Sequence, residues 1–222
     1  MAKNVTLASL ISTVRFQGDF ENSRVMSDVR ITAAINSAAS SLWDLLLDCR
    51  PDQYITTTTT TTTPGSESAS LPVDFYRLRM VEVQDGSFWR TLRPHNLSEA
   101  WRYQIAGSSP ARLTYRIQSN TLRLVPTPTA AWSIRISYFV PFVDLALSAD
   151  TFDAVNDYDD LIVARVIAKL RGGREGMDSA WWDAEAARLE RDVRNVAGDV
   201  DAGEPFALSG QRGDSFDFGG LE

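Results

Sequence analysis

The stretch SDVRITAAINSAASSLWDLLLDC, residues 27–49, predicts one long amphipathic helix around which the other elements assemble. Ser27 is a favourable N-cap, because its hydroxyl can accept a hydrogen bond from a first-turn amide that has no partner inside the helix. Asp28 places negative charge at the positive end of the helix dipole. Residues before a proline avoid helical backbone, so we expect the helix to end at Arg50 and Pro51.

The apolar side chains of this helix recur at alternating steps of four and three residues, which keeps them on one narrow stripe. Such a stripe needs partner helices to cover it. The chain offers three further segments with helical periodicity: one after Thr6, one over residues 158–171, and one from Asp178 to about residue 196. The stripe consists of Ile31, Ile35, Ala38, Leu42, Leu45 and Cys49.

A run of eight consecutive threonines, residues 56–63, opens the middle of the chain. Threonine is β-branched and favours extended backbone, so we predict a strand; low-complexity disorder is the competing interpretation. We expect this strand to pair with the polar stretch at residues 66–70, across Pro64 and Gly65, as a long two-stranded ribbon that projects from the body.

Alternating apolar residues and turn signals predict more β structure downstream. Asp85 with Gly86, and Ser119 with Asn120, mark the turns of two hairpins. We expect strands at residues 78–84, 88–92, 113–118, 121–125 and around 134–138, with a short helix at residues 98–105.

The overall prediction is an α+β fold, in which N- and C-terminal helices form a helical bundle with an inserted antiparallel β module. Residues 1–53 and 141–198 supply the helices, and residues 54–140 supply the threonine-rich ribbon and the β module. Residues 199–222 lose all periodicity and are rich in Gly, Asp and Ser, which predicts a flexible acidic tail.

Composition excludes several classes of protein. Hydrophobic residues make up 44% and charged residues 23%, as in an ordinary globular protein. A single cysteine excludes an internal disulfide framework, and one histidine beside it argues against a Cys/His metal site. We see no signal peptide and no stretch of roughly 20 apolar residues, so we expect synthesis in the cytoplasm and no membrane partner.

The formal net charge of -7 is unevenly distributed along the chain. Residues 71–140 carry nine arginines and four acidic residues, whereas residues 199–222 carry one arginine and six acidic residues. Ordinary solvated faces explain such a pattern, and the functional alternative is a basic middle and an acidic tail that meet different partners. The arginines can meet DNA phosphates or acidic surfaces, but the acidic total argues against a free DNA-binding protein.

No catalytic, cofactor-binding or metal-binding constellation emerges from the sequence. We interpret His95 as a surface or satisfied loop histidine, and Cys49 as a core residue. The carboxylates Asp157, Asp159 and Asp160 are explained by capping and by the dipole of the following helix. The pair Trp181 and Trp182 is typical of core or subunit packing rather than of base stacking.

Several motifs follow one another along the chain: TLASLISTVR, then SDVRITAAINSAASSLWDLL with Asn36 inside the helix, then the threonine-rich strand. LPVDFYRL, YRIQSNTLRLVPTP and ISYFVPFVDL come next. In this order and spacing they resemble the head-to-tail adaptor (connector) proteins of tailed bacteriophages. The resemblance covers roughly residues 6–170.

This resemblance implies a structural protein of the virion neck and not an enzyme. Such adaptors form a ring, typically a dodecamer, under the portal protein; the ring extends the DNA channel and docks the tail or nozzle protein. The expected partners are therefore the portal protein, a tail or nozzle protein, and further copies of the chain. DNA is expected to pass through the channel without sequence-specific binding.

The acidic tail is the predicted portal contact, because isolated apolar side chains on an adaptable segment can each fill a pocket. These side chains are Phe206, Leu208, Phe216 and Phe218. Two alternatives stay open: a head-completion or tail-terminator protein of the same class, and a cell-wall hydrolase that uses the carboxylates of Asp159 and Asp160.

Overall fold

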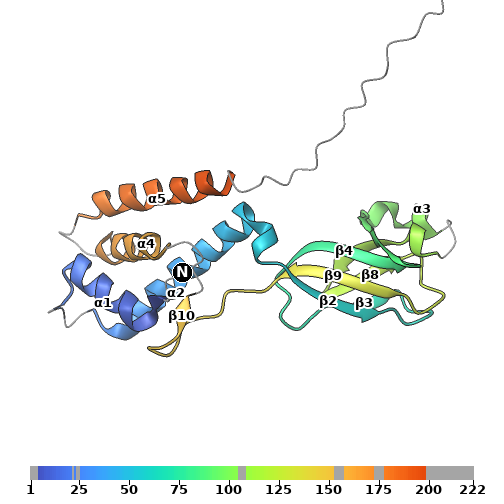
Figure 1. Ribbon diagram of the computed structural model, residues 1–222, viewed down its shortest axis with the longest axis horizontal. Helices are drawn as coiled ribbons and strands as arrows, with labels where there is room; N and C mark the ends of the chain where they lie inside the picture. Colours follow the sequence, from blue (N-terminus) through green and yellow to red (C-terminus); the bar gives the residue numbers. More distant parts are fainter. Residues whose placement is uncertain are drawn as a thin grey trace, which may run out of the picture.

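The computed structural model describes residues 5–21, 23, 26–104, 109–152, 158–172 and 178–198. It is an α+β structure drawn out along one axis, with a helical part at one end and a β part at the other (Figure 1). The helical part contains α1 (Leu7–Gly18), α2 (Asp28–Cys49), α4 (Asp159–Gly172) and α5 (Ala180–Gly198), and the β part runs from β2 (Thr56–Thr61) to β9 (Ser133–Phe139).

Helix α2 has the limits that its sequence predicts. The Ser27 hydroxyl accepts a hydrogen bond from the Arg30 amide at 3.4 Å, and Asp28 lies in the first turn. The helix ends at Cys49, and Pro51 begins a short 3-10 helix, Pro51–Gln53. Every predicted stripe residue is buried except Cys49, which is half-buried against the same core.

Side-chain caps also mark the first turns of α1 and α5. The Thr6 hydroxyl accepts from the Ser9 amide at the start of α1, and the Asp178 carboxylate accepts from the Ala180 amide at the start of α5. A short antiparallel pair of strands, β1 (Val5–Thr6) and β10 (Thr151–Phe152), lies beside these helices. All four helices contribute to one hydrophobic core, which includes Leu10, Val14, Ile31, Ile35, Leu42, Leu46, Ile162, Val166, Ile167 and Val193.

The β part holds a second core between two four-stranded sheets. The sheets have the strand orders β2-β9-β4-β5 and β3-β8-β7-β6, and every pairing is antiparallel except that of β6 with β7. Its remaining strands are β3 (Ser68–Ser70), β4 (Arg77–Asp85), β5 (Phe88–Thr91), β6 (Arg93–Pro94), β7 (Thr114–Gln118) and β8 (Thr121–Val125). The short helix α3 (Ala100–Gln104) follows a 3-10 turn, Leu97–Glu99, at the end far from the helical part (Figure 1).

The predicted projecting ribbon is wrong. Strand β2 pairs along its whole length with β9, from Thr56 opposite Tyr138 to Thr61 opposite Ser133, while β3 pairs with β8 in the other sheet. A ribbon of Thr and Ser alone has no apolar face to bury, and an isolated two-stranded ribbon is marginally stable in water. Pairing with β9 instead places the threonines beside the buried Ile134 and Ile136.

The two predicted hairpin turns are present. Gly86 has a φ of 65°, and it joins β4 to β5 through a two-residue loop in which Asp85 faces Phe88. Ser119 and Asn120 have φ values of 50° and 56°, the left-handed backbone that a two-residue hairpin turn requires.

We predict that Ser27→Ala lowers the free energy of unfolding by about 1 kcal/mol, because a first-turn amide loses its cap. Urea denaturation followed by circular dichroism measures this difference. Ser41→Ala is the matched control, since the exposed Ser41 hydroxyl only bonds back to the Ser37 carbonyl. It should leave stability unchanged or raise it slightly, because Ala is the better helix former. Equal losses in both variants would contradict the capping role of Ser27.

Candidate functional site

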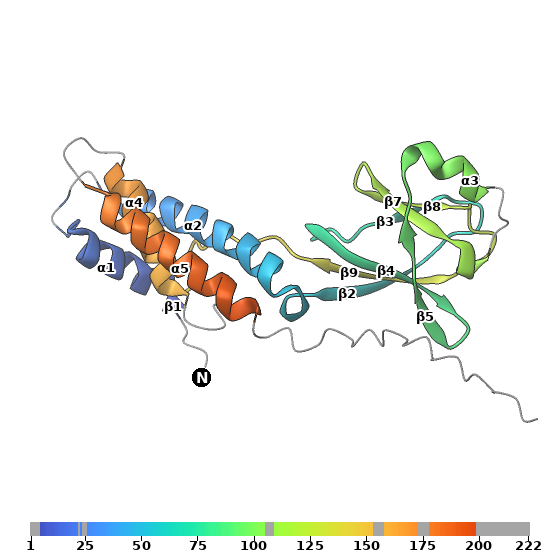
Figure 2. The same cartoon turned by 90° about the horizontal axis from the view of Figure 1, so that it is seen from above.

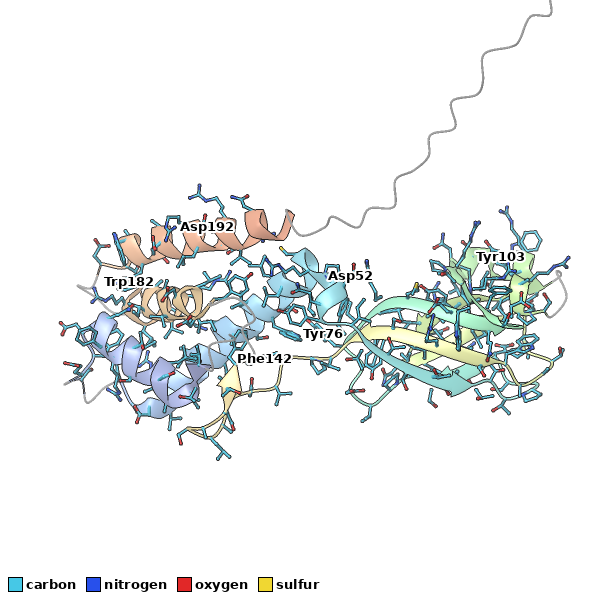
Figure 3. All side chains as sticks on the ribbon, viewed as in Figure 1. Asp52, Tyr76, Tyr103, Phe142, Trp182 and Asp192 are labelled. Carbon is cyan, nitrogen blue, oxygen red and sulfur yellow. The ribbon has the colours of Figure 1, made fainter. Side chains whose placement is uncertain are left out.

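Two surfaces of the described chain combine charge with a defined geometry, and the first is the junction between the two parts. Asp44 and Asp48 lie one turn apart at the C-terminal end of α2, and Asp52 follows in the short 3-10 helix. The beginning of β4 meets them: Tyr76 donates to Asp44 at 2.8 Å, and Arg77 donates to Asp48 at 2.7 Å. Figure 3 labels Tyr76 and Asp52, which both lie in the narrow region between the parts.

A second line of contacts holds the chain as it returns from β9 to the helices. The Trp43 indole donates to the Val140 carbonyl at 3.0 Å. Asn36, also on α2, forms both hydrogen bonds of the Leu145 backbone, at 3.1 Å from its amide nitrogen and 3.0 Å from its oxygen. One helix therefore contacts both the start of β4 and the chain segment that returns from β9 to the helices.

The polar contacts at the junction fix the orientation of the two parts more than they stabilise the fold. Arg77 and Asp48 keep 49% and 58% of their side-chain surface exposed, and exposed ion pairs contribute about 0–1 kcal/mol. The Arg77 guanidinium also lies 5.7 Å from the centre of the Phe139 ring. The hydrogen bond to the Asp44 carboxylate raises the pKa of the Tyr76 hydroxyl, which keeps this donor protonated at neutral pH.

The second surface lies at the far end of the β part and is basic. Ion pairs of Arg77, Arg79, Arg90, Arg123 and Arg135 lie within the part of the chain that the structure describes. Arg135 donates to the nearly buried Glu82 at 2.6 Å, and its guanidinium lies 4.5 Å over the Trp89 ring. Four more arginines follow between residues 93 and 116 of the sequence, where Glu99 is the one acidic residue: Arg93, Arg102, Arg112 and Arg116.

A hollow of about 500 Å³ opens on this surface between β5, β6, α3 and β7. Three arginines line it, and none of the nine lining residues is acidic. Figure 3 shows Tyr103 at this end of the molecule, among the side chains of α3. The lining residues are Arg90, Thr91, Leu92, Arg93, Tyr103, Ala111, Arg112, Leu113 and Thr114.

The interpretation of His95 as a surface or satisfied histidine is wrong, because the residue is buried and its Nδ1 has no hydrogen-bond partner among the described residues. Its backbone amide donates to the Tyr115 carbonyl, which extends the β6–β7 pairing, and its ring lies 6.0 Å from Tyr103. Burial, and secondarily the positive charge of Arg116, lower the pKa of His95. The histidine is therefore held neutral beneath the basic surface.

The other predicted residues fall in separate places. Asp159 and Asp160 lie in the first turn of α4, as capping and the helix dipole predict, while Asp157 lies outside the described residues. Trp182 packs against the helical core. Trp181 is 62% exposed, and its ring meets the Trp182 ring edge to face. The proposed portal contacts Phe206, Leu208, Phe216 and Phe218 all lie outside the described residues.

Within the described ranges there is no group of three or more His, Cys, Asp or Glu side chains arranged to hold a metal ion. None of the described helices is both long enough and apolar enough to span a membrane.

Comparison with known families assigns the chain. The family described as SU10 adaptor protein matches residues 5–206, a range that includes both the helical part and the β part. The chain belongs to this family. Membership confirms the resemblance to phage head-to-tail adaptors and makes the protein an adaptor component of a virion. No curated protein matches the sequence.

We predict that the double change Tyr76→Phe with Arg77→Gln loosens the junction without unfolding either part. Two exposed contacts contribute little to stability, so the free energy of unfolding should fall by less than about 1 kcal/mol. The alignment tensors of the two parts, obtained from residual dipolar couplings, should then differ. The matched control is Tyr103→Phe with Arg93→Gln, which makes the same chemical changes at the far end of the β part. In this control the helical part and the β part should keep the same alignment tensor. A shared tensor in the junction variant would contradict an orienting role.

Proposed function

We propose that this adaptor forms a dodecameric ring under the portal protein, extends the DNA channel, and docks the tail or nozzle protein. The family match over residues 5–206 carries this proposal, because it covers both parts of the chain rather than one common motif. The two-part shape supports it: separate cores joined by a polar junction give each copy two bodies with different surfaces.

In this proposal the helices of both chain ends act as a bundle, packed side by side with their neighbours around the ring. Closed rings need a surface of one copy to meet a different surface of the next copy. DNA passes through the channel without sequence-specific contacts. Acidic residues in 141–198 and 199–222 repel its phosphates wherever they face the channel, which keeps the DNA free to slide.

Cryo-electron microscopy of the protein mixed with the portal protein of the same phage tests the ring. We expect twelve copies in a ring beneath the portal, coaxial with its channel, with the tail or nozzle side left open. A ring seated at the distal end of a tail tube would indicate a tail terminator instead. Particles of bare portal beside free monomers would overturn the proposal.

We further propose that residues 199–222 contact the portal, with Phe206, Leu208, Phe216 and Phe218 as anchors. Apolar anchors carry much of the binding energy of many interfaces, and an adaptable segment lets each side chain find its own pocket. Bound to the portal in this way, the protein is located in the virion neck.

Deleting residues 199–222 should therefore weaken portal binding at least about tenfold, since several anchors of 1 kcal/mol or more are lost. Pull-down at graded portal concentrations measures the change, and circular dichroism should show an unchanged fold. The quadruple alanine variant of the four anchors is the sharper version, because it keeps the length and charge of the segment. Unchanged binding in both variants would exclude this segment as the portal contact.

A further inference from the structure

The hollow at the far end of the β part is lined by arginine side chains and an aromatic ring, a combination that suits a ligand with both acidic and apolar groups. Its arginines are Arg90, Arg93 and Arg112, and Arg90 also forms an ion pair with Asp85 at 3.1 Å. The Tyr103 ring also lines the hollow, and the buried Leu92 and Leu113 lie in its wall. Leu97, in the 3-10 turn before α3, is 64% exposed, and Trp101, on the same helix as Tyr103, is 58% exposed.

Duplex DNA matches this surface poorly. Its outer face presents phosphates and sugars, which satisfy arginines but leave exposed Leu and Trp side chains without apolar partners. A protein segment in which acidic and aromatic residues alternate satisfies both kinds of group. Carboxylates pair with guanidinium groups, and aromatic side chains cover apolar surface.

We propose that this hollow binds the acidic, phenylalanine-bearing C-terminal segment, residues 199–222, of the same copy of the chain. The segment carries six acidic residues against one arginine. Its apolar side chains Phe206, Leu208, Phe216 and Phe218 stand among those acids, so its chemistry is the complement of the hollow.

The length of the segment permits this contact. Helix α5 ends at Gly198, on the side of the helical part that faces the β part (Figure 2). An extended chain covers up to about 3.3–3.6 Å per residue, so position 216 can lie about 60 Å from Gly198. The longest strand of the β part, β4, has nine residues and spans only about 30 Å.

This contact goes beyond the proposed function: the docking itself does not depend on that function, and its consequence for assembly rests on the proposed portal contact. In the free protein the hollow holds the segment, and the portal then competes for the same phenylalanines. Docking therefore shields apolar side chains before assembly and makes their release depend on the portal. A failure of docking would leave the portal contact untouched, because the two are measured on different complexes.

Photo-crosslinking in the full-length chain tests the proposal without any partner. Phe216 is replaced by p-benzoylphenylalanine, the dilute protein is irradiated, and the linked peptides are mapped by mass spectrometry. We expect monomer-sized products in which position 216 is joined to residues 88–93 or 101–114. Raising the ionic strength to 0.5 M should reduce their yield, because it screens the charge pairs.

The double variant Arg93→Gln with Arg112→Gln removes two charges from the hollow, and both side chains are exposed, so the fold should persist. Its crosslinking yield should fall about fivefold. Arg30→Gln with Arg191→Gln removes the same charge from exposed positions of α2 and α5 and should keep the native yield.

Several results would overturn the proposal: crosslinks scattered over the helical part, dimer-sized products, or equal yields in the two double variants. Fluorescence anisotropy with a labelled DNA duplex adds a separate outcome. Loss of duplex binding on changing Arg93 and Arg112, with crosslinking unchanged, would assign the hollow to DNA instead.

Discussion

Helix α2 is the element on which the rest of the structure depends, because two of its faces serve two different parts. Its apolar stripe enters the helical core, where Ile31, Ile35 and Leu42 are fully buried. Its other side holds the β part through polar contacts at Asn36, Trp43, Asp44 and Asp48. Removing those contacts would leave two cores joined by two single strands of chain. A rigid helix of 22 residues, about 33 Å long, instead makes them one elongated body.

The sequence predicts those features of the fold that depend on neighbours in the chain. The caps at Thr6 and Ser27, the end of α2 before Pro51, and the turns at Gly86 and Ser119 are all short-range effects. Strand pairing is not short-range. Eight threonines in a row have no hydrophobic alternation, so nothing in them selects a register or a partner. The partner, β9, lies about 75 residues downstream, and its own alternating Ile134 and Ile136 fix which face is buried.

The composition of the candidate surfaces is likewise predictable from the sequence, but their arrangement in space is not. The excess of arginine in the middle of the chain can be counted, whereas the positions that these arginines take in the fold depend on distant residues. Among the described residues, several arginines meet carboxylates from other elements, for example Arg77 with Asp48, 29 residues away. Others, such as Arg93 and Arg112, come together at one end because α3, β6 and β7 fold together there. The burial of His95 has a related cause: the residue lies in a loop, as its place beside Pro94 predicts, but its backbone amide bonds to Tyr115 next to the β6–β7 pair and the residue becomes buried.

The charges of the molecule are consequently arranged along its long axis. On α5, Arg188 is enclosed by Glu185 and Asp192, and Glu190 receives hydrogen bonds from both Arg165 and Arg194, which lower its pKa. Three arginines of α4 and α5, Arg165, Arg188 and Arg194, are thus neutralised by carboxylates of α5, while three arginines and no acidic residue are among the nine residues that line the hollow at the far end of the β part. An elongated body with such a gradient orients in the field of any charged partner before contact. In an adaptor of a virion, this polarity favours approach to a charged partner in one direction over the other.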